Sequence, residues 1–197
     1  KEVIVNFARE LKKLGWEIIS TGGTSKIIKE EGIDVIEVEK ITNFPEILDG
    51  RVKTLNPYIH GGLLYKRDKH SHTKTLEDMD IKSIDMVVNN LYPFEESISN
   101  PNLSHDEIIE NIDIGGPAMI RAAAKNYKYV TVIVDPKDYE LVLNELRENG
   151  ESKLETRRYL ARKVFNYTAY YDSLISNYFN ELEGVLFPDK LTLDFKS

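Results

Sequence analysis

The amino-acid sequence contains no cysteine among its 197 residues. This absence excludes a thiol nucleophile, a thiolate metal site and a disulfide framework, and it fits a reducing compartment. The sequence also lacks any run of about 18 consecutive apolar residues, which a membrane-spanning helix needs. It does not open on the charged and apolar regions of a signal peptide. We therefore expect no membrane partner and a cytoplasmic location.

Positive charge is also in short supply, because 26 Lys and Arg stand against 33 Asp and Glu, a net charge of −7. An acidic chain is a poor general binder of nucleic acid, so we expect no nucleic-acid partner. The exception is local: residues 51–74 hold six Lys or Arg and one Asp, a charge of +5. The sequence thus argues against general nucleic-acid binding, but it is compatible with a site for one small anion.

What the sequence does have is a regular alternation of strand and helix patterns. The alternation predicts an α/β fold, a parallel doubly wound sheet with helices on both faces. Apolar residues at helical spacing between Val3 and Leu14, stopped by Gly15, predict the first helix. We expect strands at 17–20, 34–38, 86–88 and 129–134, and further helices at 25–31, 104–112, 117–126, 136–148 and 160–178. The aromatic stripe of the last helix is interpreted as a packing face.

The segment Thr21-Gly22-Gly23-Thr24 lies between a predicted strand and a predicted helix. There, free backbone N–H groups and the positive end of the helix dipole favour phosphate, and glycine lets the backbone approach it closely. A plain strand–helix turn explains the same residues, so this motif alone does not decide between the two.

The segment 51–57 carries Arg51, Lys53 and Thr54 within the basic stretch. Arg can clamp a phosphate with two hydrogen bonds and Lys supplies a mobile charge, so the segment suits an anion. A solvated basic loop is the alternative. The nearby His70 and His72 are interpreted as part of an exposed polar loop, because a metal site would need more ligands than this segment offers.

Two more segments follow predicted secondary structure closely. After the strand at 86–88, Asn89 and Asn90 can contact a carboxamide or base edge, and Tyr92 can donate a hydrogen bond or relay a proton. A Tyr-Pro turn packed on the core is the alternative.

Before the helix at 117–126, Gly115 and Gly116 offer backbone donors suited to a developing oxyanion, and Asp113 a polar anchor or proton partner. A glycine hinge with an acid favouring the helix dipole is the alternative. Lys125 lies about 12 Å beyond Pro117 along a straight helix, and the length and lean of its side chain close part of that gap.

Together these segments resemble the inosine monophosphate (IMP) cyclohydrolase domain of the bifunctional purine-biosynthesis proteins. The glycine turn is shared with methylglyoxal synthase-like domains, whose fold this domain resembles. The matching stretches run in family order over about residues 1–180: 20–24 with Lys26, 44–46, 50–55 with Pro57, 59–62, 90–94, 112–116 with 121–126, 135–136 with 138–139, and 155–158.

The resemblance implies ring closure of formamidoimidazole carboxamide ribonucleotide (FAICAR) to IMP with loss of water, without a metal or redox cofactor and in a homodimer. It implies that Lys125 is a proton donor or acceptor and that Lys53, Tyr92 and Asp113 are further catalytic residues. The substrate-binding residues that it implies are Lys1, Thr21, Gly22, Gly23, Thr24, Arg51, Val52, Thr54, Asn89, Asn90, Ile114 and Gly115.

The sequence departs from the family pattern in two places. Asn56 stands where the family commonly has His, and the family's first strand is absent, so one central strand is expected to be missing. We interpret residues 1–182 as the cyclohydrolase domain and 183–197 as a linker toward an absent AICAR transformylase domain, which would use 10-formyltetrahydrofolate.

Two other functions remain open. A methylglyoxal synthase-like phosphate lyase would leave the segments 51–57 and 113–125 unexplained, and a nucleotide-sensing regulatory module would not need Tyr92 or Lys125.

Overall fold

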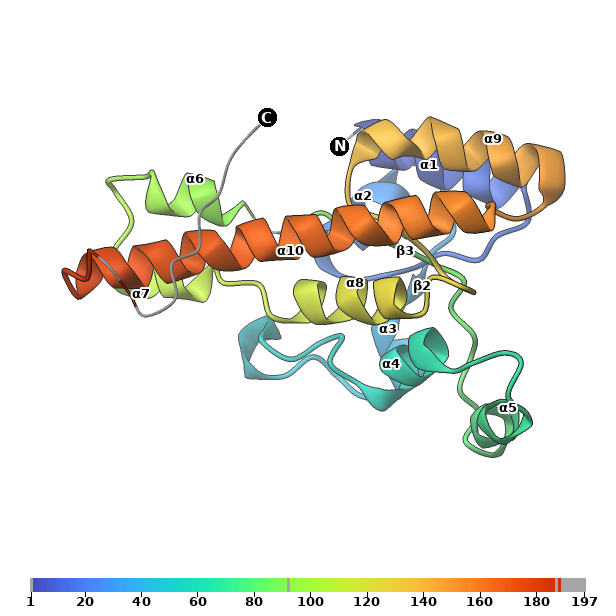
Figure 1. Ribbon diagram of the computed structural model, residues 1–197. Coiled ribbons are helices and arrows are strands. Elements are labelled where there is room, and N and C mark those ends of the chain that lie inside the picture. The colour runs from blue at the N-terminus through green and yellow to red at the C-terminus, as the bar shows by residue number, and fades with distance from the viewer. Residues whose placement is uncertain (1, 92, 187, 189–197) are drawn as a thin grey trace.

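The computed structural model describes residues 2–91, 93–186 and 188, and it has an α/β fold with parallel strands (Figure 1). Two predicted site residues, Lys1 and Tyr92, lie outside the described residues, as does most of the predicted linker. The strands are β1 (Ile19–Ser20), β2 (Ile36–Glu37), β3 (Met86–Val88) and β4 (Thr131–Ile133). The helices are α1 (Glu2–Lys13), α2 (Gly22–Glu30), α3 (Val38–Thr42), α4 (Pro57–Leu64), α5 (His70–Asp78), α6 (Phe94–Ile98), α7 (His105–Glu110), α8 (Gly115–Lys125), α9 (Tyr139–Asn149) and α10 (Leu154–Leu182), with 3-10 turns η1 (Leu48–Gly50) and η2 (Pro136–Asp138).

The strands pair in two separate parallel sheets. In one, Ile19 of β1 lies opposite Ile36 of β2. In the other, Val87 of β3 lies opposite Val132 of β4. The predicted fold class is therefore confirmed, but among the described residues the sheet is two pairs of strands rather than one continuous sheet.

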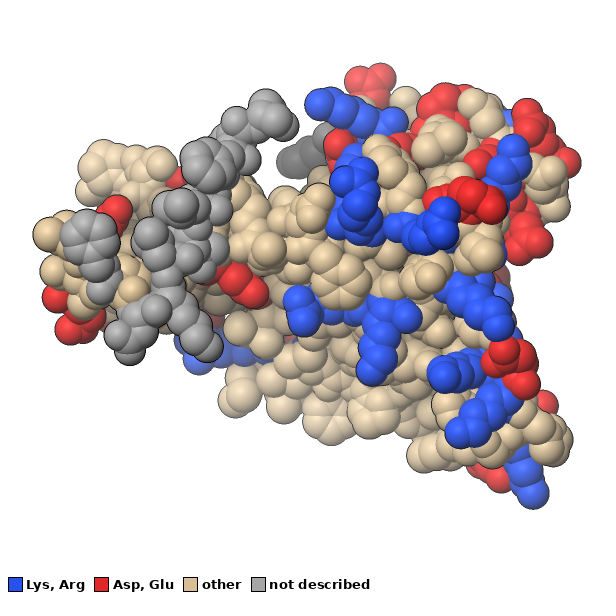
Figure 2. Space-filling view, in the orientation of Figure 1, with Lys and Arg blue, Asp and Glu red and all other residues tan. Residues whose placement is uncertain are grey.

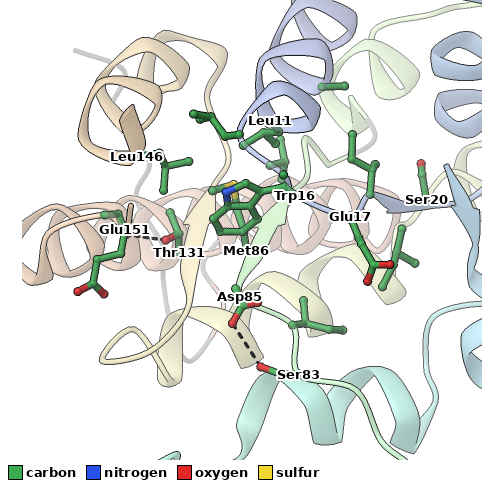
Figure 3. A pocket seen from close by; sticks show the side chains of 18 of the residues that line it. Leu11, Trp16, Glu17, Ser20, Ser83, Asp85, Met86, Thr131, Leu146 and Glu151 are labelled. Carbon is green, nitrogen blue, oxygen red and sulfur yellow. Dashed lines mark hydrogen bonds between the residues drawn. The ribbon is translucent and has the colours of Figure 1, made fainter. Parts of the chain in front are cut away.

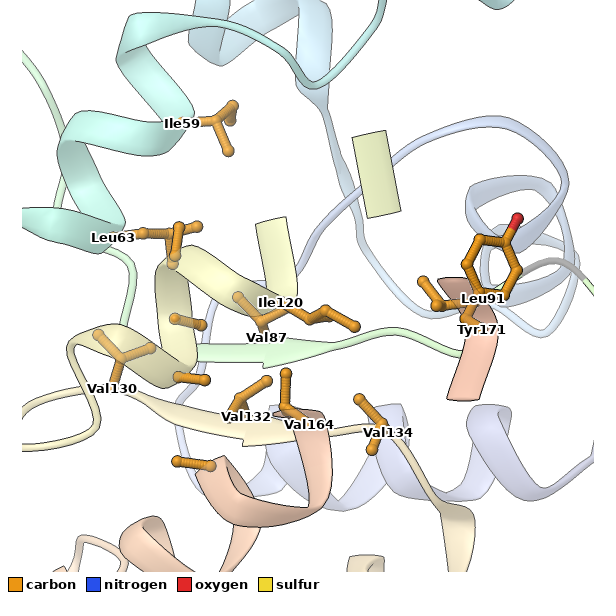
Figure 4. Packing of buried hydrophobic residues seen from close by; sticks show 14 of the residues in the cluster. Ile59, Leu63, Val87, Leu91, Ile120, Val130, Val132, Val134, Val164 and Tyr171 are labelled. Atoms are coloured by element: carbon orange, nitrogen blue, oxygen red, sulfur yellow. The ribbon is translucent and has the colours of Figure 1, made fainter. Parts of the chain in front are cut away.

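The β3–β4 pair is covered on both of its faces, as its almost wholly apolar sequence predicts. Side chains alternate along a strand. Val132 packs into a cluster with residues of α8 and α10 (Figure 4), whereas Ile133 packs with residues of α1 and α9. Both side chains are completely buried. Burying a valine or isoleucine side chain contributes about 1.5–3 kcal/mol to stability, so this pair anchors the core.

A cavity of about 630 Å³ separates the two strand pairs. One wall comes from β1 and the other from Met86 and Val88 of β3, while Leu11 and Trp16 close it at the α1 side (Figure 3). The Ile36 N–H donates to Ile18 O at 2.8 Å, and the Thr131 N–H donates to Asp85 O at 2.9 Å. Since neighbouring residues direct their backbone groups to opposite sides, Ile19, Met86 and Val88 direct theirs toward the cavity. We call it the strand cavity.

Several predicted element ends agree with the structure. Gly15 follows α1 with a φ of +84°, and Gly150 ends α9 with a φ of +77°. The Ser104 hydroxyl accepts from the Glu107 N–H and the Glu107 side chain accepts from the Ser104 N–H, which is the predicted capping box of α7.

Other details differ from the prediction. The glycine pairs at 22–23 and 115–116 lie inside the first turns of α2 and α8 rather than before them. His70 and His72 lie in α5 rather than in a loop. Asn56 caps α4, its side-chain oxygen accepting from the Tyr58 N–H at 2.9 Å.

On the surface, the two signs of charge are unevenly distributed. Figure 2 shows Lys and Arg gathered along the middle of the visible face, where α10 crosses it, and Asp and Glu gathered near α1 and α9. Within the described part of the chain, we find no helix that is both long and apolar enough to span a membrane.

Candidate functional site

A cleft of about 700 Å³ lies where β1 and β3 end, because Thr21 and Asn89, the residues that follow these strands, both line it. Ligands of open α/β sheets bind at this edge, and the volume suits a nucleotide-sized molecule. The cleft brings together eight of the predicted site residues: Thr21, Arg51, Lys53, Thr54, Asn89, Asp113, Ile114 and Gly115. We call this cavity the cleft.

The amino end of α8 forms one wall, and its two glycines are required by close contacts. A Cβ on Gly116 would lie 2.4 Å from Asp113 Oδ2 and 2.8 Å from Asn89 Nδ2. A Cβ on Gly115 would lie 2.8 Å from Thr54 Oγ1. The glycines therefore let three polar side chains crowd around the positive end of a helix dipole, where negative charge is stabilised.

Asp113 is held firmly at this wall. The Gly116 N–H donates to Asp113 Oδ1 at 2.8 Å, and the Asp113 N–H donates to the Tyr171 hydroxyl at 2.7 Å. Tyr171 is only 4% exposed, and burial raises the pKa of its phenol. The aromatic stripe of α10 thus packs in the core as predicted, but no sequence pattern indicated that Tyr171 also fixes the backbone of Asp113.

The amino end of α2 forms the opposite side. The Thr21 backbone is extended (φ −145°, ψ 159°) at the N-cap position, and its side chain makes no capping bond. Its Oγ1 is buried without a hydrogen-bond partner among the described residues. Gly22 has a φ of +57°, and a Cβ there would lie 3.6 Å from Lys53 Nζ. A hydroxyl that lacks a partner, a helix start and a cation thus lie close together, which suits an anionic ligand.

Both cations of the cleft are already paired with carboxylates. Lys53 Nζ forms an ion pair with Glu46, and Arg51 Nε donates to Glu110 Oε1 at 3.0 Å. The Arg51 guanidinium lowers the pKa of Glu110, and Glu110 in turn raises the pKa of Arg51. Tertiary contacts therefore pair both of these cations with carboxylates that lie outside the basic segment. Exposed ion pairs are weak, so a phosphate can replace Glu110 at Arg51, whose pair is more exposed than that of Lys53.

The structure does not bring every predicted residue to the cleft. Lys125 is exposed at the last position of α8, about 15 Å along the helix from Gly115. Asn90 Nδ2 donates to Val134 O at 3.2 Å and so ties the ends of β3 and β4 together. Val52 pairs with Ile47 in an isolated bridge. The predicted site residues that are described but do not line the cleft are Gly22, Gly23, Thr24, Val52, Asn90 and Lys125.

Two acidic residues of this region were missed by sequence reasoning. Glu46 belongs to the Phe-Pro-Glu stretch that carries part of the family resemblance, yet nothing in that stretch indicates its contact with Lys53. Glu110 ends α7, far along the chain from Arg51. Pairing over such separations depends on tertiary structure, so no local pattern could have revealed it.

A metal centre finds no support in the described residues, where no group of three or more His, Asp or Glu side chains is arranged to hold an ion. His72 has a structural contact instead, because its Nδ1 accepts from the Lys66 N–H at 3.0 Å. The prediction that no metal or redox cofactor is needed stays a prediction.

Comparison with known proteins agrees with this arrangement. The MGS-like domain family matches residues 3–118, and the AICARFT/IMPCHase bienzyme family matches residues 123–197. A solved structure described as the crystal structure of ForH superposes with a TM-score of 0.79 at 34% identity, covering 90% of this chain and 93% of that one.

Curated relatives extend the match over the whole chain. A "Bifunctional purine biosynthesis protein PurH" from Caldicellulosiruptor saccharolyticus is 61% identical over 100% of this chain, and one from Streptococcus thermophilus is 56% identical over 99%. The chain spans only 39% and 38% of the length of these two relatives. The chain therefore belongs to the MGS-like domain family.

Proposed function

We propose that the chain catalyses IMP cyclohydrolase chemistry, the closure of FAICAR to IMP with loss of water. One observation carries the proposal: a single cleft holds an anion-binding end around Thr21 and Lys53 and an amide-rich end around Asp113 and Gly115. A nucleotide has two matching ends, because its phosphate lies at one end and its reacting base at the other. The purine-biosynthesis relatives support the choice of substrate.

The phosphate is assigned to the α2 side of the cleft. Arg51 and Lys53 supply positive charge, the Thr21 hydroxyl supplies a donor, and the first turn of α2 supplies backbone N–H groups. Binding there exchanges the Glu110 carboxylate on Arg51 for phosphate oxygens, which carry more charge and accept more hydrogen bonds, while Glu46 stays paired with Lys53. This exchange favours a nucleotide over an uncharged base.

The reacting atoms are assigned to the α8 side. The carboxamide nitrogen attacks the formyl carbon and loses a proton as a C–N bond forms, and the former formyl oxygen gains a proton. The formamide nitrogen then gives up its own proton as it forms the C=N bond of the ring, and the C–O bond breaks to release water. Backbone N–H groups at the start of α8 stabilise negative charge on that oxygen. Asp113 and Lys53 are the predicted catalytic side chains that line this cleft, so the proton transfers are assigned to them. Because both reacting groups belong to one molecule, positioning supplies much of the rate.

Lys125 lies outside the cleft lining, although the family resemblance implies a proton-transfer role for it. We keep this role as a proposal. The variant Lys125→Ala tests it: a loss of about 100-fold or more in kcat supports the role. Full activity would leave proton transfer to Lys53 and Asp113. The proposed homodimer, the cytoplasmic location and the linker at 183–197 rest on the resemblance as well.

The decisive experiment mixes the purified chain with FAICAR and follows IMP formation by absorbance and chromatography. IMP formation that is lost in Asp113→Asn supports the proposal. Nucleotide binding without product would favour a regulatory module, and release of phosphate from a triose phosphate would favour a lyase. If a form that carries an added strand ahead of Lys1 is also inactive, the cyclohydrolase proposal is wrong.

A further inference from the structure

We propose that Glu46 is a positioning residue of the cleft, which fixes the direction of the Lys53 ammonium group. The expected change in rate rests on the proposed function. The contact between Glu46 and Lys53 does not, because it is an ion pair of the structure itself. Glu46 lies outside the cleft lining, so we expect it to act through Lys53 and not by touching the nucleotide.

Lys53 is held at a defined place by its surroundings. Its ammonium group pairs with Glu46 on one side and lies beside Gly22, whose added Cβ would be 3.6 Å away, on the other. The Lys53 side chain is 22% exposed, whereas Arg51 in the same segment is 63% exposed. A free lysine side chain samples many rotamers, and a partner that removes this freedom organises the site before the ligand binds.

The backbone between the two residues is shaped to bring Glu46 back to Lys53. Ile47 and Val52 are joined by an antiparallel bridge, with N–H···O distances of 3.2 and 3.4 Å. The residues of η1 between them, Leu48, Asp49 and Gly50, have φ values of +55°, +54° and +93°. Two of these three are not glycine, so the turn is strained, and such strain concentrates at functional sites.

Gly50 makes the carboxylate position possible. A Cβ on Gly50 would lie 3.0 Å from Glu46 Oε1, which is closer than side chains normally approach. Leu48 is 64% exposed, so burial of its side chain does not compensate for the strained turn. The turn is therefore better explained by the contact that it creates between Glu46 and Lys53 than by core packing.

Electrostatics makes the positioning role testable. A carboxylate beside an anion site repels the phosphate, so its removal should leave nucleotide affinity unchanged or tighter. Loss of position should lower the rate, because small misplacements of a reacting group are costly. A residue that only stabilised the turn would instead lower affinity, rate and thermal stability together.

The test compares Glu46→Gln with Glu140→Gln, which removes the same charge from an exposed pair with Arg147 on α9. For Glu46→Gln we expect kcat to fall about 10- to 100-fold, with an equal or lower KM and an equal or lower Kd for IMP. We expect acetate to restore part of the lost rate in Glu46→Ala. Glu140→Gln should behave as the unmodified chain does.

A second readout does not depend on activity. Limited acetylation of the full chain, followed by mass spectrometry, reports how free the Lys53 amine is; we expect it to react about fivefold faster in Glu46→Gln. Unchanged acetylation and unchanged kcat would overturn the inference, and so would a parallel loss of rate, affinity and melting temperature. If the unmodified chain forms no IMP, the proposed function fails, while the acetylation result still decides whether Glu46 holds Lys53.

Discussion

The strand cavity and the cleft have similar volumes, about 630 and 700 Å³, but they are built differently. The strand cavity is bounded by strand edges, by apolar side chains such as Leu11, Trp16 and Met86, and by charged ones that include Asp85 and Arg157. The cleft is bounded by helix ends, glycines and ion pairs, including Lys53 with Glu46 and Arg51 with Glu110.

This difference separates two kinds of cavity. A parallel strand is normally paired and covered on both sides, yet Ile19, Met86 and Val88 stay partly exposed beside the strand cavity while Val132 and Ile133 of β4 are buried. Changes in the strand cavity should therefore alter mainly the free energy of unfolding. In the cleft, polar groups converge without adding to the core, so changes there should alter mainly ligand affinity and reaction rate. Changes in each should affect different observables.

The largest effect is expected for Lys53→Ala in the cleft. We expect kcat for IMP formation to fall about 10²- to 10⁴-fold, because a proton-transfer group is removed, while the melting temperature stays nearly constant, since the ion pair with Glu46 is partly exposed. Lys29→Ala, which breaks a pair with Glu37 outside the cleft lining, is the matched control. An equal loss of rate in both variants would contradict the separation of cleft from core.

Gly116→Ala should lower both the reaction rate and the stability, because Gly116 lines the cleft and also lies in the first turn of α8. The added Cβ would lie 2.4 Å from Asp113 Oδ2, so either the side chain or the helix must move. We expect a loss of about 2–3 kcal/mol in the free energy of unfolding, in the range of overpacked sites, together with loss of activity.

The matched control for this change is Gly61→Ala in α4. There the nearest atom is a flexible one, Ile81 Cδ1 at 3.3 Å, and alanine is the better helix former. Denaturant unfolding of both variants checks the prediction. Equal stability would mean that the start of α8 adapts freely.

A strand added to the strand cavity should stabilise the fold. We expect five or six apolar residues placed ahead of Lys1 to pair with β1 and β3 and to raise the free energy of unfolding by about 2 kcal/mol, through backbone hydrogen bonds and apolar burial. Trp16 is the only tryptophan and lines this cavity, so its fluorescence should shift to shorter wavelength. The same extension with proline at alternate positions cannot donate those bonds. If both extensions have the same effect, the cavity does not accept a paired strand.

The smallest effect is expected from an exposed ion pair that lines neither the strand cavity nor the cleft. Lys128 hydrogen-bonds Asp68 at 2.7 Å and lowers the pKa of that carboxyl from 3.8 to about 2. A depressed carboxyl pKa adds stability that is present above pH 3.8 and is lost as the pH falls toward about 2. Asp68→Asn should therefore flatten the pH dependence of the melting temperature between about pH 4 and 2. A slope equal to that of the unmodified chain would contradict the pairing.

Local sequence patterns predicted much of the fold. The strand at 86–88 was placed with its observed bounds, the capping box at Ser104 is present, and Gly15 ends the first helix as expected. These features depend on residues close together in the chain, for which propensity and capping are reliable guides. The motifs also identified Thr21, Arg51, Asn89 and Asp113, which the fold brings to one cleft.

Long-range contacts could not be predicted in this way. The sequence showed a basic segment at 51–74, but the structure pairs Arg51 with Glu110 and Lys53 with Glu46. The aromatic stripe predicted that Tyr171 is buried, but not that its hydroxyl accepts from the Asp113 N–H. The helical pattern already placed Lys125 about 12 Å beyond Pro117, and only the structure shows that Lys125 does not line the cleft.

The sequence by itself thus determined the class of fold, the helix ends and the residue types of an anion site, because hydrophobic period, capping and glycine act over a few residues. Only the tertiary structure decided which charges are neutralised, how Asp113 is held, and which residues of β1 and β3 border the strand cavity. Those outcomes depend on distances between segments that are far apart in the chain, and such distances follow from the packing of the whole core.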